Sequence, residues 1–276
     1  MAKVSGKSLF AELSGPGPHP VMRGDLALAG LPGVVFTPRA GRDLPAIAFG
    51  HGWLQPPSRY RGLLRHLASW GIVAAAPATQ QGPLASHRLH AGDLGTALDI
   101  CRSVRLGDGG ISIDPGKLGV AGHSTGGGAA ILAASGNDRF KAVAAFAPAE
   151  THPSAADAAT RCDAPGLLLA GGEDLIAPAI GHAEVIAHAW HGPVTLRTLP
   201  KASHLGLTEG SHWSQLLLDG KGERKTQRIV RALFTGFFLR HLTGQTQYQA
   251  MIDDDVKGCV VDYAHGTELT TGTAPR

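Results

Sequence analysis

The sequence has little of what marks disulfide-rich, membrane-spanning or secreted proteins. It has only three cysteines among 276 residues, and their odd number and wide spacing give neither a disulfide framework nor a paired metal site. No apolar run approaches the length of a membrane span. The first 14 residues lack the apolar stretch of a secretory signal. We therefore expect no membrane span and a cytoplasmic location.

Charge is also sparse and evenly spread. Charged residues make up 17% of the chain, the net charge is +3, and the 25 basic residues are scattered. The stretches 59–65 and 222–231 hold several arginines and lysines, but their mixed composition is typical of solvated helix faces. Nucleic-acid binding needs a clustered basic face, so no nucleic-acid partner is expected. Hydrophobic residues reach 43%, which is ample for a core.

Short apolar runs alternate along the chain with stretches of helical spacing. The runs predicted to be strands are residues 34–37, 46–49, 72–76, 117–121, 141–146, 166–170 and 194–199. The stretches predicted to be helices are residues 59–70, 90–104, 126–134, 177–190 and 229–242. This alternation is typical of a mostly parallel sheet with helices on both faces, so the expected fold class is α/β.

A single domain is expected to hold these elements. We expect it to span residues 24–250, after an N-terminal extension at 1–23 and before a C-terminal edge element and tail at 251–276. The segments 78–90 and 149–165 are the only candidates for a lid, and both are modest in length. No large lid domain is therefore expected.

The most informative stretch is Gly122-His123-Ser124-Thr125-Gly126, which has the pattern G-x-S-x-G. It lies between the predicted strand 117–121 and the predicted helix 126–134. Strand, sharp turn and helix form the context in which a serine stands exposed at a nucleophile elbow. Glycines at the two flanking positions let strand and helix close around the serine. Ser124 is the predicted nucleophile.

A serine nucleophile needs a base and a group that orients the base. Ligands of such sheets bind at the carboxyl ends of the strands. There, Asp174 follows the strand 166–170 and His204 follows the strand 194–199. The order serine, acid, histidine is that of α/β-hydrolases. Asp174 is therefore predicted to orient His204, and His204 to take the proton of Ser124.

Two alternatives to these partners stay open in the sequence. Glu173 lies next to Asp174 and could be the acid instead. His212 lies eight positions beyond His204 but follows Glu209-Gly210-Ser211 rather than a strand. His204 is the preferred base for that reason.

The oxyanion of an acyl-transfer reaction needs two backbone N–H donors. Thr125, the residue after the nucleophile, is expected to supply one, and Trp53, in the loop after the strand 46–49, the other. Trp53, Leu54, Ile176 and Leu205 are expected to line an open cleft that binds the substrate. The arrangement calls for no metal and no organic cofactor.

These motifs together resemble the dienelactone-hydrolase-like branch of the α/β-hydrolase superfamily. Within that branch the chain is most similar to bacterial cutinases and polyester hydrolases, chlorophyllases and platelet-activating-factor acetylhydrolases. The resemblance covers about residues 24–242. The residues that carry it are Gly52-Trp53, 67–73, 122–128, 174–178 and 202–205.

The resemblance implies an α/β-hydrolase fold and a serine carboxylic-ester hydrolase that forms an acyl-enzyme. The expected substrate is a small ester with a short to medium acyl group. Alternatives are a cutinase-like polyester hydrolase, a thioesterase or lipid-acyl hydrolase, and a silent ligand-binding relative. Two features depart from the cutinase pattern: Ala149 follows Ala147-Pro148 where a tryptophan is usual, and Cys259 has no partner nearby in the sequence.

Overall fold

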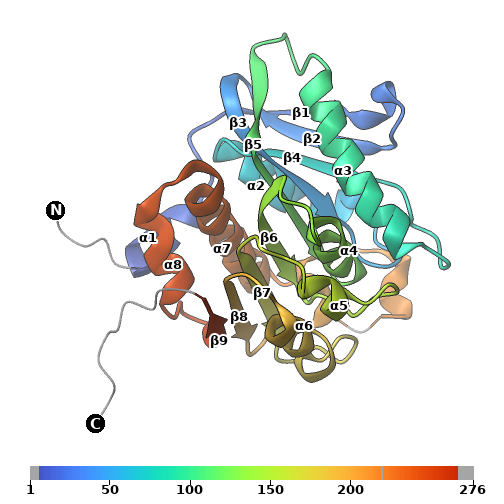
Figure 1. Cartoon of the computed structure of the whole chain (residues 1–276), viewed down its shortest axis with the longest axis vertical. Coiled ribbons are helices and arrows are strands. Elements are labelled where there is room, and N and C mark those ends of the chain that lie inside the picture. The colour runs from blue at the N-terminus through green and yellow to red at the C-terminus, as the bar shows by residue number, and fades with distance from the viewer. Residues whose placement is uncertain (1–5, 219, 267–276) are drawn as a thin grey trace.

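The protein is described here from a computed structural model that covers residues 6–218 and 220–266. Nine strands form one sheet in the order β1-β2-β4-β3-β5-β6-β7-β8-β9 (Figure 1). In chain order the strands are β1 Val21–Asp25, β2 Gly33–Pro38, β3 Gly41–Gly50, β4 Val73–Pro77, β5 Ile111–His123, β6 Phe140–Phe146, β7 Gly166–Gly171, β8 Val194–Leu199 and β9 Val260–His265.

The centre of the sheet is parallel and its edges are antiparallel. Strands β4, β3, β5, β6, β7 and β8 pair in parallel. The pairs β1–β2, β2–β4 and β8–β9 are antiparallel. The expected mostly parallel sheet of an α/β-hydrolase fold is confirmed. Parallel pairing brings the loops that follow β3, β5, β6, β7 and β8 to one edge of the sheet.

Helices cover both faces of the sheet (Figure 1). One face carries α1 Gly6–Leu13, α2 Arg61–Ser69, α7 Arg224–Thr243 and α8 Gln249–Asp253. The other carries α3 His87–Ser103, α4 Thr125–Ala134, α5 Ala155–Ala159 and α6 Ala183–Ala189. Short 3-10 helices are η1 Leu26–Ala29, η2 Pro57–Tyr60, η3 Ala179–Gly181, η4 His204–Leu207, η5 Trp213–Leu216 and η6 Thr246–Tyr248.

Strand β3 shows why the central strands are continuous apolar runs. Ala46, Ile47, Ala48 and Phe49 are all fully buried. Ile47 and Phe49 belong to the core under α2 and α7, whereas Ala46 and Ala48 belong to the core under α3 and α4. Because successive side chains of a strand point to opposite faces, a sheet covered on both faces needs apolar residues at every position.

Some elements differ from the prediction. The helix expected over 177–190 is limited to α6, because the residues before it form the turn after β7 and the short helix η3. The described residues also contain β1 and α1, which the apolar pattern did not reveal. Helix α1 lies within the predicted extension 1–23, and its Leu9 and Leu13 are buried in the core.

Strand β9 lies within the predicted C-terminal segment 251–276 and forms an antiparallel edge of the sheet. Residues 267–276 of that segment lie outside the described residues. The domain boundaries expected at residues 24 and 250 stay predictions.

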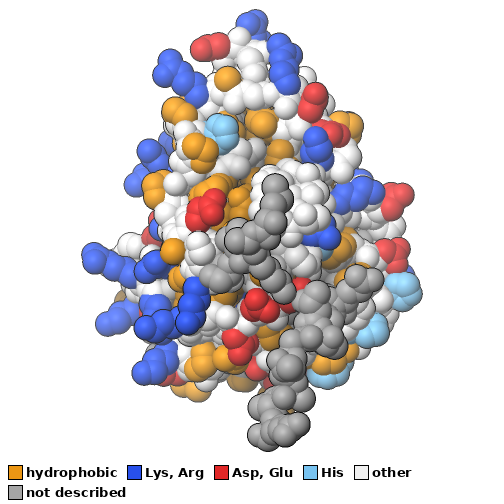
Figure 2. Space-filling view, turned by 90° about the vertical axis from the view of Figure 1, so that its left-hand side faces the viewer, with side chains coloured by type: hydrophobic (Ala, Val, Ile, Leu, Met, Phe, Trp, Pro, Cys, Tyr) orange, Lys and Arg blue, Asp and Glu red, His pale blue; other side chains and the backbone are white. Residues whose placement is uncertain are grey.

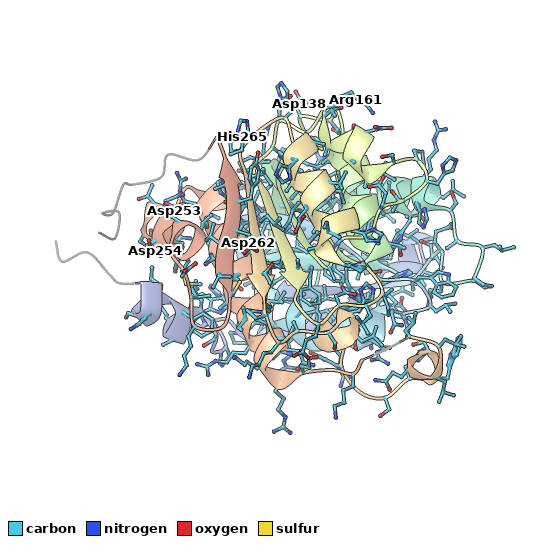
Figure 3. All side chains as sticks on the ribbon, turned by 90° about the horizontal axis from the view of Figure 1, so that it is seen from below. Asp138, Arg161, Asp253, Asp254, Asp262 and His265 are labelled. Atoms are coloured by element: carbon cyan, nitrogen blue, oxygen red, sulfur yellow. The ribbon has the colours of Figure 1, made fainter. Side chains whose placement is uncertain are left out.

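A buried arginine attaches the end of the chain to the sheet. Arg197 on β8 is fully buried, and its Nη1 donates to the carbonyl of Met251 at 2.7 Å. Its Nη2 donates to the carbonyl of Asp254. These carbonyls lie at the C-terminal end of α8, where a positive charge is favourable. Figure 3 shows Asp253 and Asp254 beside this helix and His265 at one end of β9.

The face of the molecule in Figure 2 carries charged side chains of both signs. A group of Lys and Arg side chains lies along the lower left edge of this face, whereas other charged side chains of both signs are spread over the rest of it. None of the helices within residues 6–218 and 220–266 combines the length and apolar character needed to cross a bilayer. Cys101, Cys162 and Cys259 are buried free thiols.

Candidate active site

Ser124 stands at the sharp turn between β5 and α4. Its backbone has φ 54° and ψ −127°, a conformation that non-glycine residues rarely adopt. A Cβ added to Gly122 would overlap the backbone of Gly126, and a Cβ added to Gly126 would overlap the backbone of Gly50. Gly122 is therefore required by the tight turn of the elbow itself, and Gly126 by the close approach of the elbow to the end of β3.

The structure brings Ser124, His204 and Asp174 together from three loops. The hydroxyl of Ser124 lies 2.8 Å from His204 Nε2. His204 Nδ1 lies 2.8 Å from Asp174 Oδ2 and donates to it. All three residues are buried, with exposed fractions of 5%, 3% and 5% for Ser124, His204 and Asp174. These distances are those of a nucleophile, a base and an orienting carboxylate.

The turn after β7 fixes the orientation of the Asp174 carboxylate. Its Oδ1 accepts hydrogen bonds from the amides of Ile176 at 2.9 Å and Ala177 at 2.8 Å, which leaves Oδ2 for His204. Burial acts to raise the pKa of Asp174. The hydrogen bond and charge of His204, together with the two amides, outweigh burial, so that the pKa of this carboxyl lies below its ordinary value. The acid is therefore held as a carboxylate.

The alternative residues lie elsewhere. Glu173 is exposed, whereas its neighbour Asp174 is buried against His204. His212 Nδ1 is 2.8 Å from the hydroxyl of Ser214 and caps the helix η5. Among the described residues, neither Glu173 nor His212 bonds to Ser124, and the geometry favours the Asp174–His204 pair.

The two residues predicted to supply oxyanion donors lie at a cavity in front of Ser124. A cavity of about 150 Å³ is bounded by both predicted oxyanion donors, Trp53 and Thr125, together with Ser124 and His204. Within residues 6–218 and 220–266, neither the amide of Trp53 nor that of Thr125 donates to an acceptor of the protein. Both N–H groups are therefore without an acceptor in the described part of the protein.

Three of the four predicted substrate-binding side chains lie at this cavity. Trp53, Ile176 and Leu205 line it, and Trp53 Nε1 donates to the carbonyl of Pro83 at 3.2 Å. Leu54 does not line it. Its backbone adopts the left-handed conformation, with φ 56°, and its side chain is buried away from the cavity lining. Because the chain turns after Trp53, Trp53 lines the cavity and its neighbour Leu54 does not.

Several lining residues were not expected from the sequence. The cavity is also bounded by Gly52, Gln55, His123, Ala149 and Leu218. His123 could have been suspected, because it directly precedes Ser124 in the motif. Nothing in the sequence pattern pointed to Leu218, which reaches the cavity from the segment between η4 and α7.

The site has no metal-binding character. No group of three or more His, Cys, Asp or Glu side chains in the described residues could hold a metal ion. The serine, imidazole, carboxylate and free amides form a constellation suited to acyl transfer.

Comparison with known proteins identifies the family. A family model described as PET hydrolase-like matches residues 17–252. The chain belongs to the PET hydrolase-like family. The predicted likeness to cutinases and polyester hydrolases is thereby confirmed. The matched range contains every residue of the candidate site.

One curated protein with a similar sequence is Cutinase est1 of Thermobifida alba. The two sequences are 30% identical over 152 residues, which is 55% of this chain and 50% of the relative. The chain thus spans about half the length of the curated relative it matches.

Proposed function

We propose that this member of the PET hydrolase-like family is a serine carboxylic-ester hydrolase that works through an acyl-enzyme. The observation that carries the proposal is the chain of two 2.8 Å contacts from Ser124 Oγ through His204 to the buried carboxylate of Asp174. The family match supports it. The substrate is a small ester with a short to medium acyl group, and no metal or organic cofactor takes part.

In the first step, Ser124 Oγ forms a bond to the ester carbonyl carbon while His204 Nε2 takes the hydroxyl proton. The carbonyl oxygen becomes an oxyanion that accepts hydrogen bonds from the amides of Trp53 and Thr125. His204, now an imidazolium stabilised by Asp174, gives its proton to the departing alkoxide. The alcohol leaves and the acyl group stays on Ser124.

In the second step, water takes the place of the alcohol. His204 Nε2 removes a proton from the water as its oxygen bonds to the acyl carbon, and the same two amides hold the second oxyanion. The bond to Ser124 Oγ then breaks, and His204 returns the proton to that oxygen. The products are a carboxylic acid and the free enzyme, so atoms and charges balance.

The size and lining of the cavity support the choice of acyl group. A volume of about 150 Å³ bounded by Ile176, Leu205 and Leu218 suits an acyl chain of a few carbons.

The test is stoichiometric labelling with a fluorophosphonate, read by intact mass and peptide mapping, beside a p-nitrophenyl ester chain-length series. We expect one adduct on Ser124 and turnover that is greatest for short acyl chains. Ser124→Ala should lose the adduct and at least about 10³-fold in turnover while keeping its unfolding temperature. A folded protein that takes no adduct would overturn the proposal and favour a silent ligand-binding relative.

A water-insoluble polyester is a second candidate substrate, favoured by a specific observation. Trp213, Leu216 and Leu217 are 56%, 88% and 66% exposed. They lie in the segment that attaches to Gln55 through Ser214 and supplies Leu218 to the cavity. Exposed apolar side chains beside the mouth would contact an apolar polymer surface. Release of soluble acids from a polyester film, compared with p-nitrophenyl butyrate hydrolysis, tests this candidate.

Two further expectations stay proposals. A thioesterase or lipid-acyl hydrolase would use the same residues, and rates on acyl-CoA against simple esters of equal chain length separate it from an esterase. The cytoplasmic location is tested by fractionating cells that express the full gene.

A further inference from the structure

Two buried polar residues behind the site connect the loops that carry it. Tyr60, at the end of η2, and His123, next to Ser124, are each fully buried. The hydroxyl of Tyr60 lies 2.7 Å from His123 Nδ1. The other ring nitrogen, His123 Nε2, lies 2.9 Å from the backbone carbonyl of His204. The amide of Gly52 donates to the Tyr60 oxygen at 3.0 Å.

These three hydrogen bonds form a row that runs from Gly52 through Tyr60 and His123 to His204. The direction of each bond follows from the backbone groups at the two ends of the row. The Gly52 amide can only donate, so the Tyr60 oxygen accepts and its own hydrogen is free for His123 Nδ1. The His204 carbonyl can only accept, so the hydrogen of the His123 ring is on Nε2. Each donor and each acceptor is then used in one consistent arrangement.

The ionisation of both side chains agrees with this arrangement. Burial, with a contribution from the charge of His204, lowers the pKa of His123 to about 3. Burial also raises the pKa of the Tyr60 hydroxyl well above its ordinary value. A neutral imidazole with one hydrogen and a protonated phenol are the forms that the row requires.

The row joins the three loops whose relative placement matters for acyl transfer. Gly52 directly precedes Trp53, the proposed oxyanion donor in the loop after β3. His123 directly precedes Ser124 at the elbow after β5. The carbonyl of His204 belongs to the loop after β8, and the rings of His123 and His204 lie 4.9 Å apart.

Apolar packing alone would not require these polar groups. Tyr60 packs on Phe49 at 4.8 Å and His123 stacks on Phe146 at 5.7 Å, so the surroundings would accept apolar rings. Burying a hydroxyl and an imidazole costs free energy unless every polar atom is bonded. The bonds of this row end on backbone groups of the site, so they can fix the positions of the loops that carry those groups.

We propose that Tyr60 and His123 are positioning residues that hold the Trp53 amide and the His204 ring in place around Ser124. The role rests on the proposed ester hydrolysis. Neither residue exchanges a proton with the substrate. Tyr60 acts through Gly52 and His123, and His123 acts through the backbone of His204.

The test compares Tyr60→Phe, His123→Leu and His123→Gln by steady-state hydrolysis of p-nitrophenyl butyrate and by thermal unfolding. Tyr60→Phe removes one oxygen and leaves the Gly52 amide and His123 Nδ1 without a partner. We expect kcat to fall about 10- to 100-fold with KM changed less than about threefold, because small displacements of reacting groups cost rate rather than binding. His123→Gln, which keeps an N–H donor, should retain more kcat than His123→Leu.

The matched control is Tyr248→Phe. Tyr248 is 5% exposed and belongs to the same core cluster as Tyr60, but it lies on η6, away from the three loops. It should leave kcat unchanged, whatever its effect on the unfolding temperature. Equal kcat for both tyrosine variants would overturn the positioning role.

A double variant tests whether the two residues act as one unit. Tyr60→Phe combined with His123→Leu should lose less kcat than the product of the two single losses, because both variants break the same Tyr60–His123 bond. Multiplying losses would show separate effects and contradict the row. If His123→Leu does not fold, His123→Gln takes its place in the cycle.

Fluorophosphonate labelling separates this inference from the proposed function. All folded variants should still take one adduct on Ser124, at a lower rate than the unsubstituted protein. Absence of label and turnover in the unsubstituted protein would overturn the ester hydrolase and the positioning roles with it. Label and turnover at the unsubstituted rate in Tyr60→Phe and both His123 variants would overturn the positioning roles alone.

Discussion

The inner and outer parts of the site are built on different principles. The inner part is Ser124, Asp174, His204, Tyr60 and His123, all of them buried and joined by hydrogen bonds of 2.7–2.9 Å. The outer part, residues 211–218, presents exposed apolar side chains and is bonded at Ser214 to Gln55 Nε2 of the loop after β3 at 2.8 Å.

The difference separates chemistry from substrate choice. A buried polar network has one arrangement in which every group is bonded, so a change there removes the reaction geometry. An exposed apolar segment has few fixed partners, so a change there alters what docks without moving Ser124. We expect rate to depend on the inner part and the preference between soluble and insoluble esters to depend on the outer part.

The largest expected effect comes from the inner carboxylate. Asp174→Asn keeps the size of the side chain but replaces the carboxylate that accepts from His204 Nδ1 and stabilises the imidazolium. We expect kcat on p-nitrophenyl butyrate to fall about 10³- to 10⁴-fold, with the unfolding temperature little changed. Glu173→Gln is the matched control, because Glu173 is adjacent and exposed. A similar loss in the control, or none in Asp174→Asn, would mean that the acid is misassigned.

Much of this inner part could be predicted from local sequence patterns. The elbow at Ser124 follows from glycine spacing between a strand and a helix, and Asp174 and His204 follow from their places after β7 and β8. Parallel pairing then brings such loops to one edge whatever the loop lengths are. The exact ends of the helices were less predictable, because the amides of Ile176 and Ala177 bind Asp174 instead of starting a helix.

The rest depended on contacts between distant segments. The pairing of Tyr60 with His123 joins residues 63 positions apart, and no periodicity encodes it. Leu54 shows the converse: its neighbour Trp53 lines the cavity, but a left-handed backbone at Leu54 directs the chain away. The strand β1 and the helix α1 were missed because short elements with few buried residues carry a weak pattern.

A separate effect is expected on stability at acid pH, from poorly exposed histidines at the site and away from it. Burial lowers the pKa of His123 and His90 to about 3 and of His66 and His241 to about 4. The unfolded chain binds protons at these positions near pH 6.5, whereas the folded protein does not. Stability is therefore present above pH 6.5 and is lost as the pH falls toward 4.

Each of these histidines should cost about 2 kcal/mol between pH 6.5 and 5. Denaturant unfolding at pH 7, 6 and 5 measures the loss. His66→Gln removes one buried titrating group away from the site. It should reduce the loss of unfolding free energy between pH 7 and 5 by the contribution of one histidine. A free energy of unfolding that stays constant from pH 7 to 5 would contradict the neutral, buried forms on which the inner network depends.

The smallest effect on rate is expected from the outer segment, and it sharpens the contrast with the inner part. Trp213→Ser and Leu216→Ser remove exposed apolar side chains that bond to nothing in the inner network. We expect kcat and KM on p-nitrophenyl butyrate to stay within about twofold, since surface changes away from structural contacts are nearly neutral. Product release from a polyester film should fall several-fold more, because adsorption depends on exposed apolar area.

Leu28→Ser, at a residue that is 91% exposed on η1, is the control for the loss of any surface leucine. Equal losses on both substrates would show that the outer segment supports the inner geometry, and the division between the two parts would then fail.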